Sequence, residues 1–68
     1  MITWRTVEWD ASPVAVRQTF LSNHPGDRPV LVRAKLIGGE PRLYVITYQA
    51  PLDSWADEAY TPDGRAAN

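Results

Sequence analysis

Residues 29–37, Pro-Val-Leu-Val-Arg-Ala-Lys-Leu-Ile, and residues 42–48, Arg-Leu-Tyr-Val-Ile-Thr-Tyr, decide the fold of this chain. Both runs are rich in the β-branched and aromatic residues that favour strands. Gly38-Gly39-Glu40-Pro41 separates them, and a glycine pair between two such runs is typical of a tight turn. The sequence therefore predicts an antiparallel β-hairpin.

The length of the hairpin loop decides which side chains share a face of the sheet, because side chains alternate along a strand. With an even loop, such as residues 38–41, one face carries the valines of the first strand. The opposite face then gathers a basic and aromatic set: Arg33, Lys35, Arg42, Tyr44 and Tyr48. An odd loop instead places the two tyrosines with the valines and leaves Arg33 and Lys35 opposite them.

The residues before the hairpin predict a strand and a helix. Residues 2–9 mix β-branched and aromatic types that suit a strand. Ser12 then occupies an N-cap position and Pro13 the first helical position, which predicts a helix over residues 13–22. Its apolar arc, with Arg17 inside it, is formed by Val14, Val16, Phe20 and Leu21. The turn formers of residues 23–27 end this helix.

The residues after the hairpin predict a short final element and a tail. Ala50-Pro51 ends the second strand, since proline cannot donate to a sheet ladder. Residues 52–60 could form a short helix, capped by Asp53 or Ser54, with Leu52, Trp55 and Ala59 turned inward. Residues 61–68 fit a flexible tail. The expected fold is a single α+β domain over residues 1–60, with the order β-α-β-β and an antiparallel sheet of about three strands packed on one helix.

Composition narrows the classes of function. The 68 residues contain no cysteine, which excludes disulfides and thiolate metal sites, and their net charge is −1, which gives no general attraction to nucleic acid. No apolar run reaches the length of a signal peptide or a membrane span. We therefore expect a cytoplasmic protein with no membrane partner. Residues 28–49 are mostly basic and residues 50–63 acidic, so the two segments could pair within one molecule or across a dimer.

The residues that could carry chemistry are few. His24 is the single histidine, so any imidazole base would have to be this residue, and its place in Asn-His-Pro-Gly favours a solvated turn. The acids Asp53, Asp57 and Glu58 suit the first turn of a short helix better than a metal site. We therefore expect no enzymatic activity, no cofactor and no metal.

One helix covers only one face of a three-stranded sheet, and this leaves a face for a partner. Three tryptophans and three tyrosines exceed what one such helix can cover, and exposed aromatic residues are frequent interface anchors. The candidate protein-interface residues are Trp4, Trp9, Arg33, Lys35, Arg42, Tyr44, Tyr48 and Trp55. The sequence favours a small non-enzymatic protein-binding module, a homodimer or a hetero-partner binder, of the regulator or inhibitor type that phages and mobile elements often encode. The alternative is a single-stranded nucleic-acid-binding protein that uses the same face.

Overall fold

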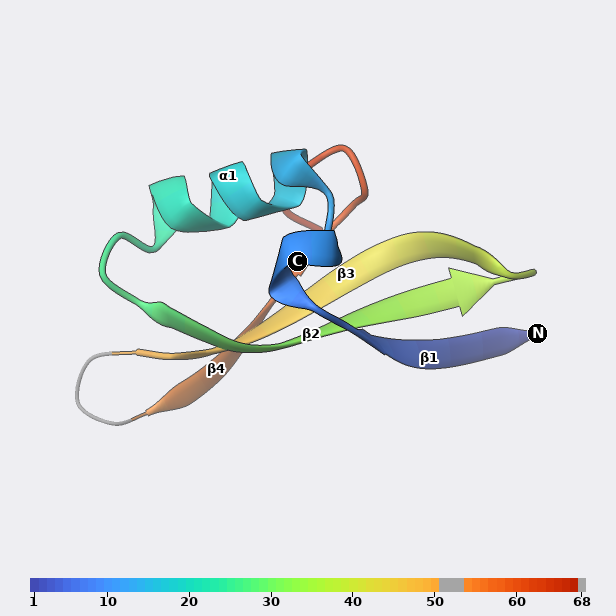
Figure 1. The fold of residues 1–68 in the computed structure, drawn as a ribbon, viewed down its shortest axis with the longest axis horizontal. Helices are drawn as coiled ribbons and strands as arrows, with labels where there is room; N and C mark the ends of the chain where they lie inside the picture. Colours follow the sequence, from blue (N-terminus) through green and yellow to red (C-terminus); the bar gives the residue numbers. More distant parts are fainter. Residues whose placement is uncertain (51–53, 68) are drawn as a thin grey trace.

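The computed structural model describes residues 1–50 and 54–67, which form an antiparallel four-stranded sheet with one α-helix packed across it. The elements, in chain order, are β1 (Ile2–Val7), the 3-10 helix η1 (Trp9–Ala11), α1 (Val14–Asn23), β2 (Arg28–Ile37), β3 (Glu40–Gln49) and β4 (Trp55–Tyr60). The strands lie side by side in the order β1-β2-β3-β4 (Figure 1). The expected α+β class, the antiparallel sheet and the single helix are confirmed, but the sheet has one strand more than expected.

The β2–β3 hairpin has a two-residue turn followed by a bulge. Gly38 and Gly39 have φ values of 61° and 84°, a left-handed conformation that glycine adopts without strain. Leu36 pairs with Pro41, whereas Lys35 pairs with Leu43, so Arg42 is an extra residue on β3. Of the two registers that the sequence left open, the bulge produces the faces of the odd loop, with Tyr44 and Tyr48 on the side of Val32 and with Arg33 and Lys35 opposite them.

The core lies between the sheet and α1. Val32 pairs with Ile46, Ala34 pairs with Tyr44, and Tyr44 pairs with Tyr60, so these side chains share the helix side of the sheet. The buried hydrophobic residues are Val16, Phe20, Val32, Ala34, Leu36, Tyr44, Ile46, Tyr48 and Tyr60. Tyrosines thus supply a third of a small core, and the sheet face opposite α1 has no cover among the described residues.

The segment expected to form a short C-terminal helix is a strand where the structure describes it. Trp55–Tyr60 pairs antiparallel with β3, from Gln49↔Trp55 to Tyr44↔Tyr60. The predicted contacts and cap at Leu52 and Asp53 lie outside the described residues. Pairing with the free edge of β3 gives this segment a ladder of inter-strand hydrogen bonds, whereas a short isolated helix is only marginally stable.

The predicted helix is confirmed, but its cap and its apolar arc differ in part. The residue before α1 is Pro13, which provides no side-chain cap, and Ser12 instead donates from Oγ to the carbonyl of Trp9 at 2.6 Å. Arg17 turns back and donates from Nε to the carbonyl of Ser12 at 3.2 Å. Val16 and Phe20 are buried, whereas Val14 and Leu21, also expected in the arc, are exposed.

The residues after β4, expected as a flexible tail, form a hydrogen-bonded turn as far as residue 67. Gly64 N donates to the carbonyl of Thr61, and Thr61 N donates to that of Arg65. Gly64 is buried with a φ of 90°, and a Cβ added there would lie 2.6 Å from the carbonyl oxygen of Ala15. The turn therefore packs directly against the first turn of α1. Within residues 1–50 and 54–67, no helix has the length and apolarity to cross a membrane.

Candidate protein-interaction face

The sheet face turned away from α1 is the candidate site, and we call it the open face. Its side chains alternate with those of the core along all four strands, as the pairing register requires. The open face comprises Ile2, Trp4 and Thr6 of β1, Arg28, Leu31, Arg33, Lys35 and Ile37 of β2, Glu40, Leu43, Val45, Thr47 and Gln49 of β3, and Trp55, Asp57 and Ala59 of β4. Its outer strands carry large apolar groups in contact with solvent, with Trp4 50% and Trp55 61% exposed.

A chain of polar contacts crosses the open face from β1 to β4. The guanidinium carbon of Arg33 lies 5.6 Å from the centre of the Trp4 ring, within the range of a cation–π interaction. Arg33 Nη2 also lies 3.8 Å from Asp57 Oδ2, and Thr47 Oγ1 donates to Asp57 Oδ1 at 2.6 Å. These contacts hold a cation, an anion and an indole ring in fixed positions on a face that also carries aliphatic and polar side chains.

Four of the predicted interface residues lie on the open face. Trp4, Arg33, Lys35 and Trp55 project from β1, β2 and β4 on the same side of the sheet. Arg42 does not belong to this group, since it is the extra residue of the bulge and its Nη2 lies 3.3 Å from Glu40 Oε2 at the exposed end of the hairpin. The sequence therefore identified the two tryptophans and the two central bases of this face.

Tyr44 and Tyr48 lie on the opposite side, although the even register placed them beside Arg33. Each is only 8% exposed, because the bulge at Arg42 turns both side chains toward α1. Tyr48 packs edge-on against Phe20, with 5.4 Å between ring centres. Both tyrosines are core residues in this structure, and the basic, aromatic surface expected from the hairpin alone is absent from residues 1–50 and 54–67.

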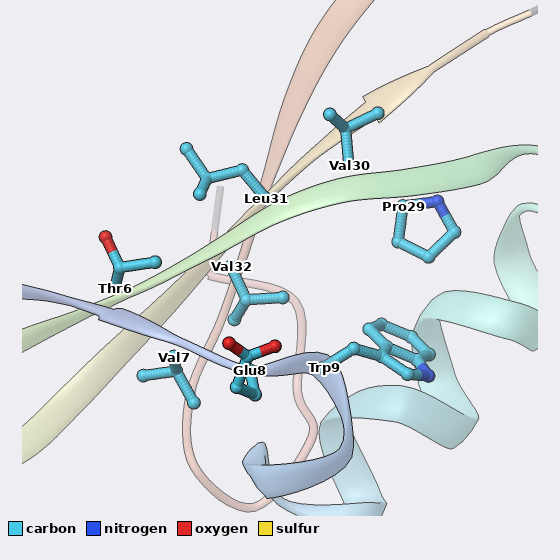
Figure 2. Close-up of a pocket in the computed structure, with 8 residues that line it drawn as sticks. All are labelled: Thr6, Val7, Glu8, Trp9, Pro29, Val30, Leu31 and Val32. Atoms are coloured by element: carbon cyan, nitrogen blue, oxygen red, sulfur yellow. The ribbon is translucent and has the colours of Figure 1, made fainter.

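Trp9 lies beside a hollow at the edge of the sheet. β1 pairs with β2 only as far as Val7↔Val32, so the start of β2 extends beyond its neighbour. A hollow of about 290 Å³ lies where β2 extends beyond the end of β1. It is lined by Thr6, Val7, Glu8, Trp9, Pro29, Val30, Leu31 and Val32 (Figure 2). Trp9 itself meets Phe20 edge-on at 5.9 Å and packs on the core. Its ring therefore belongs to the helix side of the sheet and does not reach the open face.

His24, expected in a solvated turn, is part of a compact cluster between α1 and the sheet. Its Nδ1 lies 3.2 Å from Asp27 Oδ2 and its Nε2 lies 3.3 Å from Glu58 Oε2. The ring stacks on Phe20 at 4.9 Å and meets Tyr48 at 4.5 Å, and its side chain is 17% exposed. Both ring nitrogens of His24 therefore face a carboxylate oxygen.

The contacts of this cluster, which we call the His24 cluster, link the end of α1 to the sheet. Burial, followed by the charges of Glu58 and Asp27, raises the pKa of Tyr48 above its ordinary value, so its phenol stays protonated at neutral pH. The two carboxylate contacts of His24 and its two ring contacts join the C-terminal end of α1 to β3 and β4. Within residues 1–50 and 54–67, no three histidine, aspartate or glutamate side chains are arranged to hold a metal ion.

The sequence did not reveal two features of these sites. Asp57 was assigned to a helix, and its place on the open face follows only from β4. The contact between His24 and Glu58 joins residues far apart in the chain, and no local pattern marks it. Comparison with known proteins adds no further assignment, since no protein-family model, curated protein or solved structure matches this chain.

Proposed function

We propose that this chain is a small non-enzymatic protein-binding module of the regulator or inhibitor type, which binds its partner through the open face. The observation that carries the proposal is the exposure of Trp4 and Trp55 on a sheet face that α1 leaves uncovered. Large aromatic side chains at fixed backbone positions are the residues that contribute most to protein–protein binding. Arg33 and Lys35 add charge beside them, as polar groups do at the rim of an interface.

The charges of the open face favour a protein over a nucleic acid. A single-stranded nucleic acid needs stacking rings and cations that are free to meet phosphates. Two rings expected for that role, those of Tyr44 and Tyr48, are buried in the core, and Asp57 lies beside Arg33 on the face. A mixed surface of indole rings, aliphatic side chains and both signs of charge matches a protein surface better than a phosphate backbone.

The test compares two variants of similar exposure on opposite sides of the molecule. Trp55→Ser removes an anchor of the open face, and Leu21→Ser removes a 52% exposed side chain of α1. Each protein carries a photo-activated cross-linker in place of Lys35 and is irradiated in an extract of the cells that encode it. We expect the wild-type background and Leu21→Ser to give the same cross-linked complex and Trp55→Ser to lose it. A complex that is unaffected by Trp55→Ser would contradict the proposal.

The same proteins test the nucleic-acid alternative. The probe is a short, mixed-sequence, single-stranded oligonucleotide, and its fluorescence anisotropy is followed at low and high salt. The proposal predicts no salt-dependent binding. Binding that weakens with salt and falls further in Arg33→Gln would favour a nucleic-acid-binding protein instead.

A further inference from the structure

We propose that the partner on the open face is a second copy of this chain. The two copies are related by a two-fold axis that runs along β3, so that β2 of each copy lies over β4 of the other. This inference rests on the proposed function, because it names the occupant of the same face. Packing of two sheets face to face, about 10 Å apart, is a common way to bury such a surface.

The distribution of charge is the first argument for a second copy. On the open face the bases Arg28, Arg33 and Lys35 lie on β2, and the acid Asp57 lies on β4. The uncharged Leu43, Val45 and Thr47 of β3 lie between them, and Glu40 lies at the turn end of β3. A two-fold axis along β3 exchanges the positions of β2 and β4, and therefore places the basic strand of each copy opposite the acidic strand of the other. The face is thus complementary to itself, as a two-fold interface requires.

The incomplete pairing of Arg33 is the second argument. Its Nη2 lies 3.8 Å from Asp57 Oδ2, which is too long for a hydrogen bond. A guanidinium offers five N–H donors, and the Arg33 side chain is 38% exposed, so a carboxylate from above the face can bind the Nη donors that Asp57 leaves unfilled.

The apolar side chains fit the same arrangement. Leu43 and Val45 on β3 are half-buried and uncharged, so they form a centre in which the β3 strands of two copies meet. In this dimer the exposed Trp55 on β4 of one copy lies over β2 of the other copy, the strand that includes the exposed Leu31. An apolar centre with charged groups on both sides is the usual composition of a specific interface.

The size of the face predicts a weak dimer. An axis along β3 superposes β2, β3 and β4 of the two copies and leaves β1 at the edge of the interface. Three strands about 4.8 Å apart and about six residues long at about 3.3 Å each give an overlap of roughly 14 by 20 Å per copy. That area lies below the range of stable protein interfaces and suits a weak, transient dimer, so we expect dissociation in the range of roughly 10–100 µM. The chain would then exchange between monomer and dimer over concentrations that sedimentation can sample.

The experiment is a charge exchange followed by sedimentation equilibrium. Arg33→Asp and Asp57→Arg each create two like-charge contacts in the two-fold dimer and should raise its dissociation constant by at least ~10-fold. An equal mixture of the two variants should recover the wild-type mass, since the aspartate introduced in one copy then meets the arginine introduced in the other. Arg65→Asp and Asp63→Arg make the same kinds of charge change in an exposed ion pair of the C-terminal turn, on the α1 side of the molecule, and should leave the dissociation constant unchanged.

Other outcomes would overturn the inference. If Arg33 and Asp57 act only within one chain, the double variant R33D/D57R would behave as the wild type while the mixture of single variants stayed monomeric. A wild-type protein that is monomeric up to about 1 mM would also exclude this dimer. That second result leaves the proposed function standing, because the cross-linked complex of the wild-type background would still report a different protein on the open face.

Wild-type protein provides a test that does not depend on the folding of any variant. A mixture of isotope-labelled and unlabelled chains gives nuclear Overhauser contacts that arise only between copies. The inference predicts such contacts from Trp55 and Val45 and none from Val16 or Phe20. Contacts that instead involve the exposed side of α1 would contradict it.

Discussion

The imidazole of His24 and the phenol of Tyr48 lie with their ring centres 4.5 Å apart, and this contact joins the end of α1 to the sheet. It places a residue expected in solvent and a residue expected at an interface together in one cluster. The bulge at Arg42 makes this contact possible, because it turns Tyr48 toward the helix. The helix side of the sheet is therefore an aromatic core, and the open face is the surface available to a partner.

Removing His24 is expected to destabilise the fold. His24→Ala loses two ring contacts and leaves the carboxylates of Asp27 and Glu58 without the donor between them. We expect the free energy of unfolding to fall by about 2 kcal/mol, since partly buried polar groups lose their partners. Urea denaturation at neutral pH measures this change. Gln18→Ala, at an exposed position of α1, is the control. An equal effect of both variants would show that the contacts of His24 add nothing specific to the free energy of unfolding.

The aromatic residues are expected to divide into two groups by their effect on stability. Tyr48→Ala removes a buried ring and should cost about 3–5 kcal/mol, whereas Trp55→Ala removes an exposed ring and should cost less than about 1 kcal/mol. Thermal unfolding followed by circular dichroism distinguishes them. A Tyr48→Ala protein as stable as the wild type would show that this tyrosine lies on a surface. The even-loop register, in which Tyr48 shares a face with Arg33 and Lys35, would then be favoured.

Alkaline pH is expected to unfold the protein through Tyr60. Burial, and then the charge of Glu58, raises the pKa of Tyr60 above its ordinary value of 10.0. Between the ordinary and the raised pKa the unfolded chain loses a proton that the folded protein keeps, so the contribution of Tyr60 to stability is complete below about pH 10 and is lost as the pH rises through the folded value. The free energy of unfolding, measured from neutral pH to about pH 11, should show this decline.

Tyr60→Phe is the control for that decline and tests a second property of the residue. The hydroxyl of Tyr60 is buried, and although Asn23 is near enough to lower its pKa slightly, no hydrogen bond of normal geometry reaches it within the described residues. Tyr60→Phe should reduce the alkaline decline, with the remainder due to Tyr48, whose pKa burial also raises, and should keep or raise the neutral-pH stability, by up to about 1 kcal/mol. A loss of stability at neutral pH would show that the hydroxyl has a partner.

Gly64 and Gly26 form a matched pair for the packing of the C-terminal turn. Both have a φ of 90°, but a Cβ at Gly64 would lie 2.6 Å from the backbone of Ala15, whereas a Cβ at Gly26 meets nothing within 4 Å. Gly26→Ala should cost only the conformational strain of about 1 kcal/mol, and Gly64→Ala should cost at least about 2 kcal/mol more. Equal losses in chemical denaturation would show that residues 61–67 do not pack on α1.

The local patterns predicted the hairpin and the helix, because turn residues and β-branched runs act over a few neighbouring positions. They did not predict β4, since the alanines and glutamate of residues 55–60 suit a helix locally and become a strand only through pairing with β3. They also left the register open. One extra residue, Arg42, exchanges the faces of the strand, and nothing near it in the sequence marks a bulge.

The candidate site was predicted in part for the same reason. Trp4, Arg33, Lys35 and Trp55 were identified by residue type, and they lie on one face only because β1, β2 and β4 are joined in one sheet. Tyr44 and Tyr48 have equally suitable side chains for an interface. Their burial depends on a register that residue type does not determine.

The three tryptophans provide the most direct test of the claim that the open face mediates association. Trp4 and Trp55 lie on the open face, and Trp9 packs on the helix side as an internal control. The indole N–H signals are followed in nitrogen–proton correlation spectra as the protein is diluted from about 1 mM to about 10 µM. The account predicts that the Trp55 signal shifts with concentration, that the signal of Trp4 at the edge of the overlap shifts less, and that the Trp9 signal stays fixed. A shift of Trp9 alone, or no shift of any indole at any concentration or with any cross-linked partner, would contradict it.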